Sequence, residues 1–298
     1  MISTASRPEL GSAERLRLRI QARWLRTLLD GLSFLFLSAV ALLMLLPFWW
    51  LFATSLRTPA ESFHLPPVWF PREIILTNYA EVFTRLPFAL MALNSLKITV
   101  LIVGGQLATC SLAAYAFARL RFPGKSLLFG LLMASLMVPI TLTIIPVFMT
   151  VRLLGLADTH AALILPPALT SAFGVFLLRQ FYLTIPTELE DAAKIDGASP
   201  LQIFLRVIVP LTLAPLSVLA IFAFNGYWNE FFRPLIFLQT TEKFTLPLGL
   251  VTLRGIYGQG SISVILAGVF VSMLPVLLVY VVAQRHLVEG ITLTGIKG

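Results

Sequence analysis

Six long apolar runs constrain the fold of this chain more than any other feature. They cover about residues 32–55, 92–118, 127–150, 161–183, 212–238 and 261–284. A helix needs roughly 20 apolar residues to cross the hydrocarbon core of a bilayer. Only helices satisfy their own backbone hydrogen bonds within one lipid-exposed segment, and the runs lack the strict alternation of barrel strands. The sequence therefore predicts an all-α integral membrane protein with six transmembrane helices.

The composition supports a membrane protein over a water-soluble one. The 298 residues are 58% hydrophobic and 12% charged, whereas soluble domains carry about 25% charged residues. The net charge of +8 comes with arginines placed next to apolar runs, which favours a role in topology and excludes a nucleic-acid interface. The single cysteine, Cys110, lies in an apolar run, so neither a disulfide framework nor a cysteine metal site is expected.

The distribution of basic residues predicts the orientation of the six helices. If the tail before the first run is cytoplasmic, alternation places 14 of the 22 Lys and Arg residues inside, as the positive-inside rule requires. Both termini and the segment between the fourth and fifth runs are then cytoplasmic. The inside set is Arg7, Arg15, Arg17, Arg19, Arg23, Arg26, Arg119, Arg121, Lys125, Arg179, Lys194, Arg206, Arg285 and Lys297.

The N-terminal region is expected to remain attached. The first apolar run exceeds the 7–15 residues of a signal-peptide core, and no small-residue cleavage site follows it. We expect residues 1–30 to form a basic cytoplasmic segment and residues 31–298 to form a transmembrane domain. The basic segment is either an amphipathic helix on the membrane surface or a positively charged barrier to insertion.

Prolines shape two parts of the chain between the apolar runs. The longest external segment, Arg57–Leu90, contains five prolines and is expected to be a short packed excursion. The third run contains Pro139 and Pro146. Proline removes a backbone hydrogen bond and bends a membrane helix, so this run is predicted to be bent, in either a moving helix or a static one.

The fifth run ends with polar residues. Glu230 and Arg233 are three residues apart and are predicted to pair on one helix face. Charge inside a membrane suggests a functional site. However, Glu230 lies roughly 30 Å from the inner surface at the helical rise of ~1.5 Å per residue, which favours an interfacial anchor. Asn225 and Asn229 are candidates for lining a polar translocation path.

Catalytic and nucleotide-binding motifs are not found. Lys125 lies in the sequence FPGKS, but a phosphate loop needs glycine where Arg119 stands. The three histidines, His64, His160 and His286, are too far apart in sequence to suggest a metal site. We expect no catalytic residue, metal or cofactor in this chain, so the energy for uphill work must come from a partner or an ion gradient.

The polar segment, residues 187–210, concentrates signals for two short helices. Thr187 with Glu190 forms a capping-box pattern, which predicts a helix from about Glu188 to Asp196. Gly197 is expected to end this helix in the left-handed conformation. Ser199 is expected to cap a second helix.

The same segment carries both acidic and small residues. Four of the 14 acidic residues lie here, Glu188, Glu190, Asp191 and Asp196. The bend between the two helices is surrounded by Ala192, Ala193 and Ala198. Small side chains permit close approach to a concave surface, and acidic side chains give register against a basic partner. The alternative is an ordinary acidic loop.

The pattern D-A-A-x-x-D-G-A at Asp191–Ala198, with Pro210 thirteen residues after Gly197, resembles the EAA loop of ABC importer permeases. Across nearly its whole length the chain is similar to maltose-type (MalG-like) sugar permease subunits. The matching segments are NSL at Asn94–Leu96, AAYAFARLRFPGK at Ala113–Lys125, LILPP at Leu163–Pro167, FLLRQFY at Phe176–Tyr182 and GITLTGIKG at Gly290–Gly298.

The resemblance implies a permease subunit of an ATP-driven, binding-protein-dependent importer of sugars or related polar solutes in the bacterial inner membrane. The implied partners are a second, MalF-like permease, two ATP-binding subunits that hold ATP and Mg, and an extracytoplasmic solute-binding protein. A self-sufficient secondary transporter or channel is the competing class, and a non-transporting scaffold is the third.

The resemblance also implies site residues. The EAA segment corresponds to a coupling helix that docks on a cytoplasmic ATPase subunit, and the C-terminal tail corresponds to one that reaches the ATPase dimer. The leading Glu of the motif is replaced by Asp191, beside Glu190, so either residue could meet the partner. The coupling residues are Glu190, Asp191, Ala192, Ala193, Asp196, Gly197 and Pro210, and the tail residues are Thr292, Thr294 and Lys297.

Overall fold

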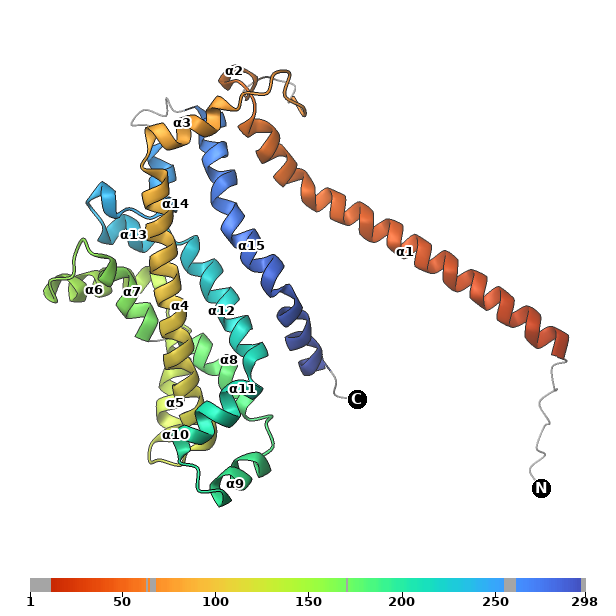
Figure 1. Cartoon of the computed structure of the whole chain (residues 1–298), viewed down its shortest axis with the longest axis vertical. Coiled ribbons are helices and arrows are strands. Elements are labelled where there is room, and N and C mark those ends of the chain that lie inside the picture. The colour runs from red at the N-terminus through yellow and green to blue at the C-terminus, as the bar shows by residue number, and fades with distance from the viewer. Residues whose placement is uncertain (1–11, 63, 65–67, 170, 255–260, 296–298) are drawn as a thin grey trace. The chain divides into compact units, whose positions relative to one another are not determined.

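The computed structural model describes residues 12–62, 64, 68–169, 171–254 and 261–295, with the side chains of residues 12–22 and 285–295 outside the description. The chain divides into two units, Met1–Ala53 and Thr54–Gly298. Every regular element within the described residues is helical (Figure 1). The prediction of an all-α protein is confirmed for this part of the chain.

The first unit is built on one helix. Helix α1 spans Ser12–Ser55, and its last two residues belong to the second unit. The stretch Arg23–Ser55 is long and apolar enough to cross a membrane. It contains the first predicted span, 32–55.

The excursion that follows α1 is held against the end of that helix by a buried side chain. It contains α2 (Pro59–Ser62) and α3 (Thr77–Arg85). The buried Asn78 side chain donates hydrogen bonds of 2.9 Å to the carbonyl oxygens of Ser55 and Arg57. This agrees with the short packed excursion predicted for the segment.

Helix α4 (Phe88–Arg119) is the element against which most of the second unit packs. Helices α7 (His160–Leu169), α8 (Ala172–Tyr182) and α12 (Leu213–Trp228) lie along it (Figure 1). A Cβ atom built on Gly105 would lie 2.6 Å from the Ala168 Cβ. This glycine therefore permits the close crossing of α4 and α7.

Side chains of α4 also satisfy carbonyl groups at the break between α7 and α8. The Gln106 amide donates to the Pro167 carbonyl at 2.9 Å, and the Thr109 hydroxyl donates to the Ala168 carbonyl at 2.9 Å. The last carbonyls of a helix have no partner within it. In an apolar environment such groups must find one elsewhere, and α4 provides it.

The third predicted span is two helices rather than one. Helices α5 (Lys125–Ser135) and α6 (Ile140–Leu153) meet at an angle of 105°. Pro139 precedes α6 with an extended backbone (φ −60°, ψ 136°). Proline has no backbone N–H and disfavours helical geometry in the residue before it. The expected proline bend is therefore present as a full break.

The fifth predicted span, 212–238, is wrong as a single helix. Helix α12 ends at Trp228, and α13 begins at Phe232 and ends at Phe237. In a continuous helix the ring of Pro234 would clash with the carbonyl of Glu230. The Asn229 amide meanwhile donates back to the Asn225 carbonyl at 2.9 Å.

The elements after α13 are the one-turn 3₁₀ helix at Thr241–Lys243, α14 (Leu246–Thr252) and α15 (Ile262–Gly295). Helix α15 packs on α12 and α3, and the Trp228 indole donates to the Ser272 carbonyl at 3.0 Å. Among the described residues, four helices are long and apolar enough to cross a membrane, or up to six if each bent pair is one span.

Candidate functional site

The polar segment forms the two predicted helices. Helix α9 spans Glu188–Ile195 and is followed by Gly197 with φ +79°. Helix α10 (Pro200–Ile203) begins with a reciprocal cap. The Ser199 hydroxyl accepts from the Gln202 backbone N–H at 3.4 Å, and the Gln202 side chain accepts from the Ser199 N–H at 2.8 Å.

The predicted cap at Thr187 is wrong. Thr187 has a helical backbone (φ −69°, ψ −24°), and its side chain makes no capping hydrogen bond. Glu190, the expected partner in that cap, is instead turned into the protein and is 5% exposed. Its carboxylate forms an ion pair with the Arg119 guanidinium, Nε to Oε1 at 2.7 Å.

Arg119 joins three parts of the second unit. It is the last residue of α4, it pairs with Glu190 of α9, and it donates a hydrogen bond to the Ile185 carbonyl in the connection from α8 to α9. The Arg119 and Glu190 side chains are 10% and 6% exposed. A buried ion pair of this kind is costly to break from one side because the remaining charge stays desolvated.

The outer face of α9 has a different character. Asp191 and Lys194 pair at 2.8 Å with side chains 63% and 59% exposed, and the hydrogen bond that Lys194 donates to Asp191 raises the Lys194 pKa. Ala192, Asp196 and Gly197 are exposed. The α9 surface therefore presents small and acidic residues to the outside, together with Lys194 and Ile195, which is 87% exposed.

Two predicted coupling residues lie apart from this face. Ala193 is half-buried and packs against the apolar cluster that contains Tyr115 and Phe204. Pro210 lies in α11 (Val209–Leu211), after a π-helical stretch at Phe204–Ile208. The structure brings Asp191, Ala192, Asp196 and Gly197 together on one exposed surface and leaves Glu190 behind it.

Two basic residues, Arg179 of α8 and Lys125 of α5, bind the carboxyl end of α4. Arg179 donates to the Phe117 carbonyl at 3.2 Å and lies 4.3 Å over the Phe129 ring, and Lys125 donates to the Leu120 carbonyl at 2.9 Å. Cations near the last carbonyls of a helix are favourable. The sequence placed both residues in the cytoplasmic basic set and Lys125 in a rejected phosphate-loop pattern, so this structural role was not predicted.

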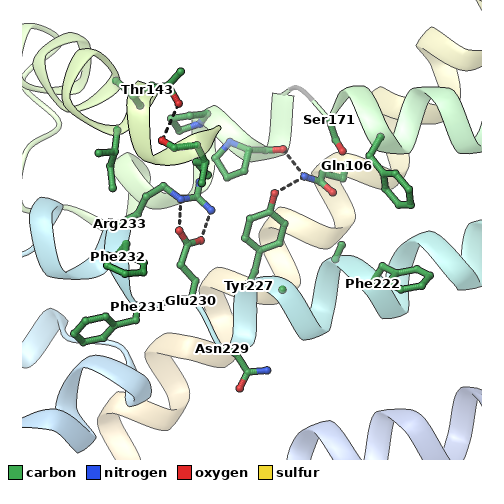
Figure 2. A pocket seen from close by; sticks show the side chains of 18 of the residues that line it. Gln106, Thr143, Ser171, Phe222, Tyr227, Asn229, Glu230, Phe231, Phe232 and Arg233 are labelled. Atoms are coloured by element: carbon green, nitrogen blue, oxygen red, sulfur yellow. Dashed lines mark hydrogen bonds and ion pairs between the residues drawn. The ribbon is translucent and has the colours of Figure 1, made fainter. Parts of the chain in front are cut away.

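A second polar region lines a pocket of about 660 Å³ between α4, α6, α7, α12 and α13. Glu230 and Arg233 form an ion pair through both carboxylate oxygens. The Arg233 guanidinium lies 5.2 Å over the Tyr227 ring. The Tyr227 hydroxyl accepts from the Gln106 amide at 2.8 Å, so the four residues form one polar group (Figure 2).

The sequence predictions for this region are partly corrected. The pairing of Glu230 with Arg233 is confirmed, but Glu230 lies in the break between α12 and α13 rather than on one helix with Arg233. Asn229 lines the pocket, and Asn225 is not among its lining residues. Gln106 and Tyr227 were missed, although a glutamine within an apolar run was a signal.

Asp158 fixes a loop next to this region. It has φ +55° and accepts from the backbone N–H groups of Gln239 and Thr240 at 2.8 and 3.1 Å and from the Lys243 ammonium at 2.9 Å. These hydrogen bonds, led by the one from Gln239, lower the Asp158 pKa well below its usual range. The Asp158 carboxylate thus ties the turn between α6 and α7 to the loop after α13.

The predicted tail residues are only partly described. Thr292 and Thr294 lie in the last turns of α15 with side chains outside the description, and Lys297 lies outside the described residues. Within the described ranges, no group of three His, Cys, Asp or Glu side chains has the geometry of a metal site.

Comparison with known proteins gives consistent matches. The model of the family described as "Binding-protein-dependent transport system inner membrane component" matches residues 106–292. The arabinooligosaccharides transport system permease protein of Halalkalibacterium halodurans is 33% identical over 278 residues, covering 92% of this chain and 96% of the relative. The sulfoquinovosyl glycerol transport system permease protein of Agrobacterium fabrum is 34% identical over 277 residues, covering 92% and 97%.

A solved structure also matches. It belongs to a bacterial ABC transporter involved in the import of the acidic polysaccharide alginate. The TM-score is 0.74 and the identity 25%, with 94% of this chain and 99% of that chain covered.

Proposed function

The chain belongs to the family of binding-protein-dependent transport system inner membrane components, and on that premise we propose that it is the sugar-importing permease subunit of an ATP-driven transporter. Membership makes it a transport permease of an ABC importer. The sugar substrate is supported by the relatives, which carry oligosaccharide or sugar-glycerol transport in their names. The observation that carries the proposal is similarity along more than nine-tenths of the chain.

We propose the membrane arrangement as follows. Each bent helix pair is one span, which gives six spans within residues 31–298, and both termini are cytoplasmic. This is supported by the broken pairs α5–α6 and α10–α12, which are long and apolar enough to cross a membrane only when joined. The polar segment and the carboxyl end of α4 then lie on the cytoplasmic side with the basic residues of the positive-inside set.

The proposed assembly contains a second, MalF-like permease, two ATP-binding subunits and an extracytoplasmic solute-binding protein. ATP and Mg bind to the ATP-binding subunits, and this chain holds neither. Helix α9 is the coupling helix that docks on one ATPase subunit. Its exposed residues, Asp191, Ala192, Asp196 and Gly197, form the contact surface because small residues allow close approach and carboxylates match a basic partner.

Glu190 and Asp191 take different roles in this proposal. Asp191 is exposed and meets the ATPase, whereas Glu190 is buried and holds α9 to α4 through Arg119. Movement of α9 by the closing ATPase dimer is then passed to α4 as a rigid-body displacement. The tail residues Thr292, Thr294 and Lys297 are proposed to add a second contact with the ATPase dimer.

The decisive experiment is purification of the chain from its native membrane, followed by reconstitution of the complex into proteoliposomes. We expect two ATP-binding subunits and a second permease to co-purify, and sugar uptake to require ATP and the solute-binding protein. Uptake by this chain alone without ATP would instead support a secondary transporter. A stable chain without an ATPase partner would support a scaffold.

A glycine pair tests the coupling role of α9. Gly197→Asp is expected to reduce ATP-driven uptake at least tenfold, because it adds a charged side chain to the proposed contact surface. Gly124→Asp is the matched control: Gly124 also has positive φ (+77° against +79°), and at both positions a Cβ would meet nothing within 4 Å. Equal uptake by the two variants, with the ATPase bound in both, would contradict the assignment.

A further inference from the structure

The pocket between α4, α12 and α13 retains unused hydrogen-bonding capacity. A carboxylate offers about four acceptor sites, and the bonds from Arg233 use one site on each Glu230 oxygen. The Tyr227 hydroxyl accepts from Gln106, which leaves its own proton to donate. Within the described residues, the pocket therefore offers both donors and acceptors (Figure 2).

The charges that line the pocket cancel. Of its lining side chains, Glu230 and Arg233 are the charged ones, and they neutralise each other. An anionic ligand would compete with Glu230 for its partner Arg233, and an amine would compete with Arg233 for the Glu230 carboxylate. A hydroxyl group is both donor and acceptor, so it can bind beside the ion pair without breaking it.

Apart from Thr143, Ser171 and Asn229, the rest of the pocket lining is apolar or aromatic. Phe173 and Phe222 meet edge to face with centroids 6.1 Å apart, and Phe231 lies next to Phe232 at 5.8 Å. The pocket volume of about 660 Å³ falls in the range of small-molecule sites, ≈ 300–1,000 Å³. Aromatic faces combined with a few polar groups suit a ring that has apolar C–H faces and a hydroxyl-bearing edge.

We propose that this pocket is a binding site for a neutral glycosyl unit, held by hydroxyl contacts with Glu230, Tyr227 and Gln106. The inference rests on the proposed function, because it names the class of solute that the importer carries. An apolar helix of the second permease is a poorer occupant, since it would bury the unused donor and acceptor groups without partners. The site discriminates against acidic sugars, in contrast to the similar structure, whose transporter imports alginate.

The test uses chemical labelling of the assembled transporter. The described chain has one cysteine, Cys110, which is buried, so Cys110→Ser with Thr143→Cys places a single thiol at the pocket, which Thr143 lines. The rate of its reaction with a water-soluble methanethiosulfonate is measured in nanodiscs without the solute-binding protein. The neutral probes are maltotriose, arabinotriose, lactose and raffinose, and the acidic probe is trigalacturonate.

We expect at least one neutral probe to slow labelling threefold or more, and trigalacturonate to have no effect. Tyr227→Phe should raise the protecting concentration at least fivefold. Tyr79→Phe is its matched control, because it removes a hydroxyl that bonds to Ser55 at 2.7 Å outside the pocket. Protection by trigalacturonate equal to that by neutral probes, or no protection by any probe, overturns the inference.

A thiol that reacts in the isolated chain but not in the complex also overturns it, because the second permease then fills the pocket. The result is separable from the proposed function. ATP-driven sugar uptake without pocket protection removes this inference alone. Pocket protection without a co-purifying ATPase removes the proposed importer and leaves the binding site.

Discussion

Two Arg–Glu ion pairs of similar burial serve two regions of the molecule in different ways. Arg119 and Glu190 come from α4 and α9, and their side chains are 10% and 6% exposed. Arg233 and Glu230 are three residues apart, and their side chains are 9% and 18% exposed. The long-range pair joins two elements behind an exposed helix, whereas the local pair lines a pocket. Sequence separation, more than chemistry, decides which pair holds the fold together.

The largest expected effect comes from breaking the long-range pair. Glu190→Ala leaves the buried Arg119 charge without its partner, and removal of one partner of a buried pair costs about 3–5 kcal/mol. Asp191→Ala, one residue along, removes an exposed pair and should change stability far less. Denaturant unfolding of the purified chain measures both variants.

A double-mutant cycle sharpens this comparison. The coupling energy between Arg119→Met and Glu190→Gln should exceed that between Glu230→Gln and Arg233→Met, because the second pair faces a pocket rather than packed protein. Equal coupling energies, or equal destabilisation by Glu190→Ala and Asp191→Ala, would show that the two pairs do not differ in structural role.

An intermediate effect is expected from adjacent glycines in α4. A Cβ on Gly105 would meet the Ala168 Cβ at 2.6 Å, whereas a Cβ on Gly104 would meet nothing within 4 Å. Gly105→Ala should cost about 1–3 kcal/mol by overpacking and move Gln106 in the pocket. Gly104→Ala should be neutral or stabilise the helix by roughly 0.5–1 kcal/mol.

Thermal unfolding measures the change in stability of both glycine variants, and pocket labelling tests whether Gln106 has moved. The polar segment should be unaffected by either glycine variant, because α9 is remote from the crossing of α4 and α7. A loss of ATPase binding in Gly105→Ala, with pocket labelling unchanged, would contradict the separation of the two regions.

The smallest effects should appear as opposite pH dependences. Asp158 has a lowered pKa because of the hydrogen bonds that it accepts from Gln239, Lys243 and Thr240. The contribution of Asp158 to the stability of the folded loop is complete above the unfolded pKa of ~3.9. This contribution is lost as pH falls below that value. Lys194 has a raised pKa because of Asp191, so its contribution is complete below the unfolded pKa of ~10.4 and is lost at higher pH.

Hydrogen exchange at single residues measures the first of these effects. The Gln239 and Thr240 amides donate to Asp158. Their protection from hydrogen exchange should therefore decrease as the pH is lowered below about 4. Asp158→Asn should remove this dependence. Unchanged protection of both amides at pH 3 in the wild-type chain would show that the carboxylate does not hold the loop.

Local sequence patterns predicted what depends on neighbours along the chain. The apolar runs indicated membrane helices, the Ser199 cap and the left-handed Gly197 are present, and the Glu230–Arg233 pair is formed. The predicted Thr187 cap is absent because the Glu190 side chain instead forms an ion pair with Arg119, a residue far away in sequence. The family resemblance was confirmed by relatives that cover nearly the whole chain.

Contacts between distant segments could not be predicted from local patterns. Hydropathy identified the third and fifth runs, and the prolines predicted a bend in the third, but neither predicted its 105° angle or the end of α12 at Trp228. The pocket depends on Gln106 and Tyr227, which come together only when α4 and α12 pack. Local sequence propensity contains no information about contacts between two such distant helices.

The two breaks in the helices beside α4 differ in stiffness. The end of α7 is held to α4 by hydrogen bonds from Gln106 and Thr109, so moving this helix end away from α4 breaks them. The bend at residues 136–139 has backbone hydrogen bonds only to neighbouring turns, and Met137 is 84% exposed. A displacement of α4 would therefore carry the end of α7 with it, whereas the chain can change direction at residues 136–139 while breaking only hydrogen bonds within neighbouring turns.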